Sequence, residues 1–412
     1  MKIIVIVVLA FVQHLFAQDV YLKLTTGQRK KVNIAISFQS EELKAIADEM
    51  KKVIKEDLIF SLYFDNIMDT TITDEKTIFP SLASEGVSAF IKAEVAIKKG
   101  DTIATVEIYD VYIRRKISGE KYIVHQPTIR RTCHRISDAI IKALTGENGI
   151  SQTRIALSFK QGMDKKICIV DYDGQGFDQI TTGKGLHLSP RWIPNSDAIT
   201  YVAYKEEDMW IYRFDIYTGK LDILSQERGM NIGAAWSPTA KEFALILTKD
   251  GNPEIYTKSG NKIQRLTVDR AIESSPTWSP NGREICFVSD RSGGPQIYIM
   301  SKDGTNVRRL TFRGGYNTSP VWSPKGDRIA YVAREVDGTF QVHSILVGGE
   351  GDSYLTFEDN NEDPSWSPDG LHLCFVSDRK GRSELFTMHW DGSGQKKIAS
   401  AGDGCYTPSW SY

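Results

Sequence analysis

The most regular pattern along the chain is a set of short apolar runs and polar turns that recurs every 42 or 44 residues. In one unit, residues 274–278, 283–289, 295–301 and 305–312 read as four short strands separated by turns rich in Pro, Asp and Gly. Four strands in each repeat of about 40–45 residues are typical of a β-propeller blade. The repeat is marked by six tryptophans: Trp192, Trp236, Trp278, Trp322, Trp366 and Trp410.

The two ends of this array are incomplete in a complementary way. The repeat of Trp410 contains only a first strand, whereas residues 154–160, 166–172 and 179–183 form three strand-like segments before the first complete repeat. We expect these segments to pair, because closure removes the free sheet edges that promote aggregation. The sequence therefore predicts a six-bladed all-β propeller over residues 150–412, closed by its N- and C-terminal segments.

Residues 18–149 show no such repeat and predict a small α+β domain. Residues 32–38 read as a strand, and residues 40–58 as an amphipathic helix with Ser40 as its N-cap. A hairpin is expected to turn at residues 99–101. A last helix from residue 132 is expected to end at Gly146.

Residues 1–17 have the pattern of a secretory signal peptide: Lys2, an apolar run, and the small Ala17 before the expected cleavage site. The run is shorter than the ~20 residues that span a bilayer, and we expect no membrane span elsewhere. The next segment, residues 18–30, begins QDVYLKLTTG and alternates apolar and polar side chains. It is either an edge strand of the first domain or an extended segment that adds to a partner's sheet.

Composition excludes several classes of function. A net charge of −1 argues against a nucleic-acid-binding protein. Two of the five cysteines, Cys286 and Cys374, occupy a repeat position at which other copies have Ala244 and Ala330. Such a position predicts a small buried side chain, and neither a disulfide framework nor a zinc site is expected.

No constellation in the sequence predicts catalysis. The G-x-S-x-G motif of propeller-capped serine peptidases does not occur, the histidines are scattered, and the Asp-rich turns lack the ligands of a calcium loop. The pairs Asp290–Arg291 and Asp378–Arg379 recur with the repeat, which favours salt bridges within turns. We expect a non-enzymatic protein without cofactor or metal.

The residues just before each Trp vary and are mostly polar, whereas the Trp and its turn are constant. A constant framework with a variable rim suits recognition of a protein or peptide at the channel mouth. The candidate contact residues are His187, Met230, Asn231, Gly233, Glu273, Ser274, Ser275, Asn317, Thr318, Glu362 and Asp363.

The domain order and three stretches resemble the TolB family of periplasmic Tol-Pal proteins. The stretches are the junction HRISDAIIKALTGENGISQTRIALSF (residues 134–159), the opening DVYLKLTTG and the ending PSWSY. The resemblance implies a monomeric periplasmic protein that binds the peptidoglycan-associated lipoprotein Pal at the channel mouth and supports envelope integrity and cell division. It also implies binding of the TolA C-terminal domain through Asp19, Val20, Tyr21, Leu22, Lys23 and Leu24.

The Pal-binding positions of the family correspond here to Met230 and Gly233 before Trp236, and to Ser274 and Ser275 before Trp278. Enterobacterial members commonly have a histidine and an acidic residue where this chain has Met230 and Ser275. The alternative interpretation is a propeller that binds a peptide or carbohydrate, or a non-catalytic relative of the propeller-capped peptidases.

Overall fold

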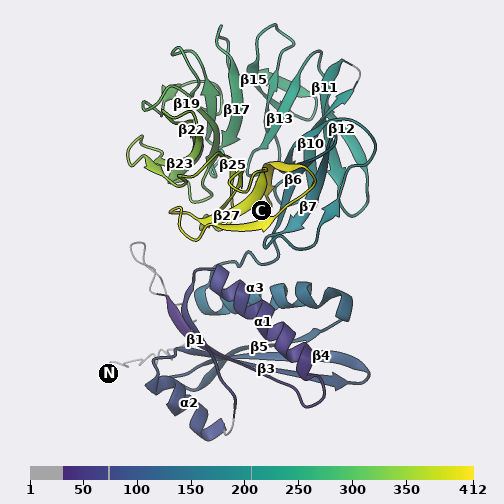
Figure 1. Ribbon diagram of the computed structural model, residues 1–412, viewed down its shortest axis with the longest axis vertical. Coiled ribbons are helices and arrows are strands. Elements are labelled where there is room, and N and C mark those ends of the chain that lie inside the picture. The colour runs from purple at the N-terminus through teal and green to yellow at the C-terminus, as the bar shows by residue number, and fades with distance from the viewer. Residues whose placement is uncertain (1–30, 73–74, 206) are drawn as a thin grey trace, which may run out of the picture. The chain divides into compact units, whose positions relative to one another are not determined.

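The computed structural model describes residues 31–412 apart from residues 73–74 and 206. The chain divides into two compact units, with the boundary between Gly149 and Ile150 (Figure 1). The predicted signal peptide and the segment of residues 18–30 lie outside the described residues. Among the residues that are described, no helix is both long and apolar enough to cross a membrane.

The described part of the first unit is a five-stranded sheet with helices on its faces. The strand order is β2-β1-β3-β4-β5; β1 is parallel to β2 and β3, and β3, β4 and β5 are antiparallel. Helices α1 and α3 pack together on one face and α2 lies on the other (Figure 1). The elements are β1 Val32–Gln39, α1 Lys44–Phe60, β2 Phe64–Asp69, α2 Glu75–Ser84, β3 Ala89–Lys98, β4 Asp101–Asp110, β5 Arg115–Ile123, η1 Gln126–Thr128 and α3 Ile129–Thr145.

Hydrophobic periodicity predicted the long elements of this unit. Strand β1, the turn between β3 and β4, and the end of α3 at the left-handed Gly146 agree with the expectations. Helix α1 begins four residues after Ser40, although the Ser40 hydroxyl still accepts a hydrogen bond from the Leu43 N–H at 2.8 Å. Strands β2 and β5 and helix α2 were missed, because their sequences are short or largely polar and α2 contains Pro80.

A buried polar cluster joins the two helices on one face of this sheet. The carboxylate of Asp57 on α1 accepts a hydrogen bond from Ser137 at 2.6 Å and lies 2.9 Å from Nδ1 of His134, both on α3. All three side chains are almost completely buried. Because a buried carboxylate is costly without partners, this cluster fixes how α1 packs on α3.

Residues 150–412, apart from residue 206, form six four-stranded antiparallel sheets arranged as the blades of a propeller (Figure 1). In chain order the strands of blades 1 to 3 are β9 His187–Trp192, β10 Ala198–Lys205, β11 Asp208–Asp215, β12 Leu221–Ser225, β13 Asn231–Trp236, β14 Phe243–Leu247, β15 Glu254–Ser259, β16 Lys262–Arg265, β17 Glu273–Trp278, β18 Glu284–Ser289, β19 Gln296–Ser301 and β20 Arg308–Arg309. Those of blades 4 and 5 are β21 Asn317–Trp322, β22 Arg328–Arg334, β23 Phe340–Leu346, β24 Ser353–Tyr354, β25 Asn361–Trp366, β26 His372–Ser377, β27 Glu384–His389 and β28 Lys396–Ala399.

Blade 6 joins the two ends of the array. It consists of β29 Gly404–Trp410, β6 Arg154–Gln161, β7 Asp164–Asp171 and β8 Asp178–Gln179. Strand β29 pairs antiparallel with β6, so that Trp410 lies opposite Ile155 and Gly404 opposite Lys160. The predicted fold class, an α+β domain followed by a six-bladed propeller closed in this way, is confirmed.

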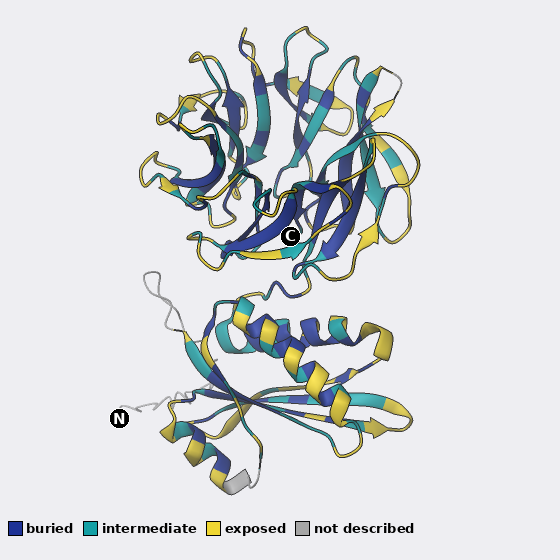
Figure 2. Cartoon of the chain, in the orientation of Figure 1, coloured by how far each residue is buried: buried dark blue, intermediate teal, exposed yellow. Residues whose placement is uncertain are grey.

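The apolar core of the propeller lies between blades. One cluster packs Ala244 and Ile255 of blade 2 against Trp278, Ile285 and Phe287 of blade 3, and equivalent clusters occur around the ring. Burial is concentrated in the inner strands of each blade, whereas the outermost strands, such as β8 and β12, and most connecting loops are more exposed (Figure 2). This arrangement makes each blade depend on its neighbour.

Four of the five cysteines lie in the propeller, and Cys133 lies on α3 of the first unit. All five lie in the described residues, are buried and form no disulfide. Cys286 and Cys374 are completely buried at the position taken by Ala244 and Ala330, as the repeat predicts. Burial raises the pKa of the Cys133 thiol to about 12 and that of Cys405 to about 11, so these thiols are protonated at neutral pH.

Candidate binding surfaces of the propeller channel

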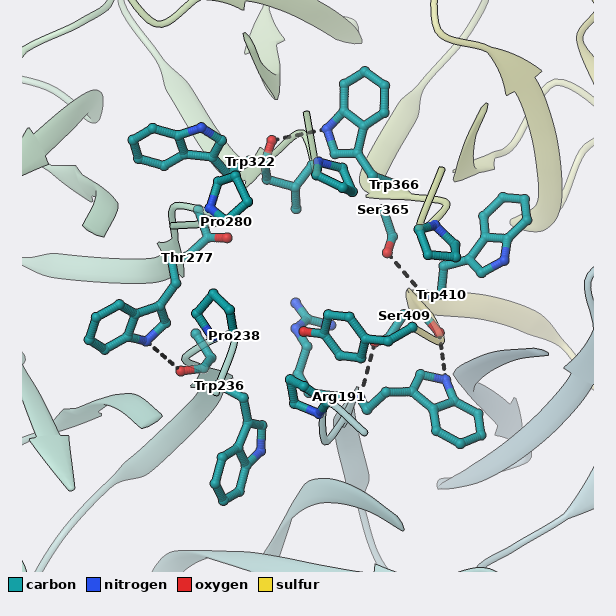
Figure 3. A pocket seen from close by; sticks show the side chains of 18 of the residues that line it. Arg191, Trp236, Pro238, Thr277, Pro280, Trp322, Ser365, Trp366, Ser409 and Trp410 are labelled. Carbon is teal, nitrogen blue, oxygen red and sulfur yellow. Dashed lines mark hydrogen bonds between the residues drawn. The ribbon is translucent and has the colours of Figure 1, made fainter. Parts of the chain in front are cut away.

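The innermost strands of the blades, β9, β13, β17, β21, β25 and β29, line the central channel. At the end where these strands finish, the channel widens into a cavity of about 360 Å³ (Figure 3). Its wall includes each Trp, the residue before it, the proline that follows two residues later in five blades and the proline that lies two residues before the Trp in four blades. The candidate contact residues lie toward the start of the same strands, and one of them, Ser275, also lines the cavity.

The tryptophans hold adjacent blades together. The indole N–H of Trp278 donates to the carbonyl oxygen of Ala235 at 2.9 Å, and that of Trp366 donates to Val321 at 3.1 Å. Trp192 donates to Ser409 at 3.0 Å across the closing blade. Each of these three bonds reaches the innermost strand of the preceding blade, whereas the indole of Trp410 donates to Thr153. The indole rings of the repeat are also part of the apolar packing between blades.

Every inner strand contains a β-bulge at the same place, three residues before its Trp. The residue there has a left-handed backbone conformation in all six blades: Ser189, Gly233, Ser275, Ser319, Asp363 and Thr407. Five of the six carry a Cβ, for which this conformation is strained. The bulges bend the strands at the rim, a placement that often accompanies a binding site.

Sequence reasoning did not foresee these bulges, although a signal existed. A proline follows the left-handed residue in five of the six strands. Proline cannot donate to a ladder and inside a sheet is confined to edges and bulges. The prolines therefore mark the bulges in the sequence.

Eight of the eleven candidate contact residues are at least partly accessible at the rim. The side chain of Met230 is 38% exposed and that of Glu362 is exposed. The remaining six are partly buried: His187, Gly233, Ser274, Ser275, Thr318 and Asp363. These eight residues stay candidates for partner contact, and we call them the rim set.

The other three candidates, Asn231, Glu273 and Asn317, are completely or almost completely buried. The amide of Asn317 donates to Gln296 of the preceding blade at 2.8 Å, and that of Asn231 donates to the Glu227 carbonyl at 2.7 Å. Strand alternation places them on the covered face of the bulged strand. They support the rim from beneath and do not present a side chain to a partner.

Glu273 is the only acidic residue among these three. One carboxylate oxygen accepts hydrogen bonds from Arg291 at 2.8 Å and Ser289 at 2.9 Å. Burial raises the pKa of the Glu273 carboxyl, and Arg291 opposes this rise. The Arg291 guanidinium also lies over the ring of Tyr298, at 5.2 Å from its centroid.

The predicted salt bridges within the Asp-Arg turns are wrong. Arg291 pairs with Glu273 rather than with Asp290, whose carboxylate accepts the N–H of Ile272 at 2.8 Å. Arg379 likewise donates to Asn361 at 2.7 Å, whereas Asp378 accepts from the N–H of Asn360. The side chains of adjacent residues in a strand or tight turn point in different directions. The Asp and the Arg of each pair therefore bond other residues and not each other.

Charge on the rim is concentrated at blade 5. Burial raises the pKa of both Glu362 and Asp363, and Asp363 accepts the N–H of Thr407 in blade 6 at 3.0 Å. At His187 burial lowers the pKa, which favours the neutral imidazole at neutral pH. The rim set is therefore acidic on one side of the ring.

Arg191 is a channel residue that sequence reasoning missed. It precedes Trp192 and projects into the cavity (Figure 3). Its Nη1 donates to the Pro190 carbonyl at 3.0 Å. Aligning the six repeats would have found it, because the equivalent residues of the other blades are uncharged.

Within the described residues, no group of three or more His, Cys, Asp or Glu side chains is arranged to hold a metal ion. The proposed TolA-type contact residues 19–24 lie outside the described residues. The candidate surfaces in the described residues are the rim set and the cavity wall.

Both parts of the chain match family models of known proteins. The family model described as the TolB beta propeller domain matches residues 141–412, and the model of the TolB amino-terminal domain matches residues 20–117. The crystal structure of TolB from Acinetobacter baumannii superposes with a TM-score of 0.79 at 25% identity, covering 93% of this chain and 97% of that one.

Curated relatives are named Tol-Pal system protein TolB. The protein from a Polaromonas species is 34% identical over 202 residues, which are 48% of this chain and 47% of that protein. The protein from Rickettsia bellii is 29% identical over 266 residues, which are 61% of this chain and 60% of that protein. The chain thus spans about half the length of the first of these relatives. On the match of both family models, the chain belongs to the TolB family of Tol-Pal system proteins.

Proposed function

We propose that this chain is a non-enzymatic periplasmic adaptor of the Tol-Pal system. It binds a Pal-type lipoprotein through the rim set of the propeller and a TolA-type C-terminal domain through residues 19–24. In this way it links layers of the cell envelope during growth and division. The observation that carries the proposal is that TolB family models match both parts of the chain, residues 20–117 and 141–412.

The chemistry of the rim set supports the first contact. Met230 offers an exposed, adaptable apolar side chain, and Glu362 and Asp363 offer an acidic side to a basic or hydrogen-bond-donating partner. The left-handed residues hold this rim in a fixed shape before a partner arrives. A preformed rim lowers the ordering cost of binding.

The rim contact is tested by calorimetry of the mature protein with the soluble domain of a Pal-type lipoprotein. We expect Met230→Arg and Glu362→Arg each to weaken binding by roughly tenfold or more, as for central interface residues. The matched control is Tyr217→Arg, which is 73% exposed in the turn between the outer strands β11 and β12 and belongs neither to the rim set nor to the cavity wall. Equal affinities for all three variants would place the lipoprotein elsewhere.

The second contact is tested by removing residues 18–30 from the mature protein. We expect capture of a TolA-type C-terminal domain to be lost while capture of the Pal-type domain is kept. If the shortened protein still captures the TolA-type domain, residues 19–24 are not its site. Failure of the intact mature protein to capture either domain would overturn the adaptor proposal as a whole.

A further inference from the structure

The residue before the Trp differs in charge between the six blades. The residue before the Trp is neutral in blades 2 to 6, and it is charged only in blade 1, as Arg191. The neutral residues are Ala235, Thr277, Val321, Ser365 and Ser409. Because the backbone of the repeat is the same in every blade, this cation is not required to build the framework. Its side chain places one positive charge on one side of the cavity (Figure 3).

The surroundings of Arg191 are those of a binding pocket and not of a structural ion pair. The wall around it is formed largely by tryptophan and proline rings. A guanidinium has five N–H groups, and the hydrogen bond to Pro190 occupies one of them. Among the described residues no carboxylate forms an ion pair with Arg191. Burial of a cation with few hydrogen bonds costs free energy, and burial lowers the pKa of Arg191 accordingly.

The nearest acidic influence comes from Asp363, which acts on Arg191 electrostatically. One oxygen of its carboxylate accepts the N–H of Thr407 at 3.0 Å, and no ion pair joins it to Arg191. The phenol of Tyr412 also lies within electrostatic reach and lines the cavity. Neither group supplies the two parallel acceptors that match a guanidinium.

We propose that this cavity binds an apolar carboxylate, whose anionic group pairs with Arg191 while its hydrocarbon part packs against the tryptophan and proline rings. The volume of about 360 Å³ lies in the range of small-molecule sites. Apolar walls with one charged group fix the orientation of such a ligand. The carboxylate is either that of a free small molecule or the C-terminus of an apolar peptide.

This proposal goes beyond the adaptor function and does not depend on it. The rim set lies three to six residues before each Trp. The cavity wall shares only Ser275 with it and otherwise consists of residues from two before the Trp to three after it. The two surfaces therefore meet at Ser275 in blade 3 and otherwise lie toward opposite ends of the inner strands. We expect loss of ligand binding in the cavity to leave capture of a Pal-type domain unchanged. We likewise expect loss of that capture to leave ligand binding in the cavity unchanged.

The test is a titration of the full mature chain followed through the indole N–H signals in ¹H–¹⁵N NMR spectra. The probes are 3-phenylpropionate, its neutral counterpart 3-phenylpropanamide, and N-acetyl-alanyl-phenylalanine, which carries a peptide carboxylate. The six tryptophans of the repeat report on the cavity. Trp210 and Trp390 lie outside the cavity wall and serve as internal references.

We expect saturable shifts of the cavity tryptophans with 3-phenylpropionate and at least about tenfold weaker binding of the amide, the effect of losing a charged hydrogen-bonded pair. Arg191→Gln should weaken binding of 3-phenylpropionate to the level of the amide. Arg308→Gln, on the outer strand β20, should leave the binding of 3-phenylpropionate unchanged. Tighter binding of the acetylated dipeptide would identify a peptide C-terminus as the source, and weaker binding a free small molecule.

Equal binding of acid and amide, or unchanged binding by Arg191→Gln, would overturn the proposal and leave a merely apolar cavity. Shifts that do not saturate at millimolar concentration of both carboxylates would overturn it as well. If Arg191→Gln does not fold, the comparison of acid and amide on the unaltered chain still decides the question.

Discussion

Polar side chains buried at the start of the inner strands are a main chemical difference between blades. Blade 3 has the acidic Glu273 where blades 2, 4 and 5 have asparagine, and it supplies Arg291 to balance the charge. Glu273 is completely buried, and its pair with Arg291 reaches only one of its oxygens. Burying such a pair costs desolvation free energy. Removing one partner strongly destabilises the protein, because it leaves the other charge buried without a counter-charge.

Glu273 should make stability depend on pH. A carboxyl whose pKa is raised on folding favours the folded state below its unfolded pKa, near the ordinary value of 4.5, and this contribution is lost as pH rises through the folded pKa. We therefore expect the free energy of unfolding of the wild type to fall relative to that of Glu273→Gln from about pH 4.5 upward. Urea denaturation of both proteins across this range measures the difference.

The control for this experiment is Glu350→Gln, a change at an exposed side chain. Its stability should run parallel to that of the wild type. Parallel curves for Glu273→Gln too would show that Glu273 ionises in the folded protein as it does in the unfolded chain.

The buried cluster of the first unit gives a second prediction at this scale. Asp57→Ala leaves Ser137 and His134 without this acceptor, and we expect it to destabilise the first unit by about 3 kcal/mol. All eight tryptophans lie after residue 190, so the measurement is hydrogen exchange of α1 and α3. Asp48→Ala, an exposed change on the same helix, should have an effect within about 0.5 kcal/mol. Equal exchange in both variants would argue against the cluster.

Among the elements, the six inner strands share a β-bulge that the alternating sequence pattern does not predict. A strand that alternates in sequence contains a bulge with a left-handed residue in the structure, six times over. Three of the six left-handed residues, Gly233, Ser275 and Asp363, belong to the rim set. The strand ladder on both sides of each bulge holds this backbone conformation in place. The shape of the rim therefore depends on backbone geometry as much as on side chains.

Adjacent residues of β21 should respond to glycine in opposite directions. Ser319 has a φ of 51°, so Ser319→Gly relieves a strained backbone and should stabilise the propeller by up to about 1 kcal/mol. Its neighbour Thr318 lies before the bulge and is not left-handed, so Thr318→Gly should destabilise by about 0.5–1 kcal/mol. Thermal unfolding followed by circular dichroism compares the two. Equal losses would mean that the bulge stores no strain.

For the whole molecule, closure of the ring decides stability. Blade cores are shared between neighbours, and blade 6 exists only when β29 joins β6, β7 and β8. The indole of Trp410 donates to Thr153 at 2.8 Å and so connects positions 257 residues apart. A contact this distant in sequence forms only in the complete ring.

Deletion of residues 405–412 should open the ring. It removes most of β29 and one Trp, and we expect a loss larger than the roughly 4–5 kcal/mol that marks the upper end for single substitutions. Thermal unfolding followed by circular dichroism is the measurement. Removal of Tyr412 alone is the control and should cost less than about 1 kcal/mol. Unchanged unfolding of the eight-residue deletion would show that β29 does not hold the propeller closed.

The sequence by itself determined the repeat, the number of blades, the closing pair of segments and the long elements of the first unit. These follow from local periodicity, because the side-chain period of a strand or helix is set by its own backbone. It also suggested where a partner would bind, since the residues before each Trp vary where the framework does not, and that suggestion stays a prediction. Short, polar or edge elements such as β2, β5 and α2 escaped, because their formation depends on neighbours far away in the chain.

Only the tertiary structure decided which rim residues face outward. Asn231, Glu273 and Asn317 are as polar as the accessible members of the rim set, yet they lie beneath the surface in bonds to other loops and, for Asn317, to the preceding blade. The partner of Arg291 and the isolation of Arg191 among aromatic and proline rings were likewise beyond the sequence. Burial and pairing arise from packing between segments that are distant in sequence, and no local pattern records them.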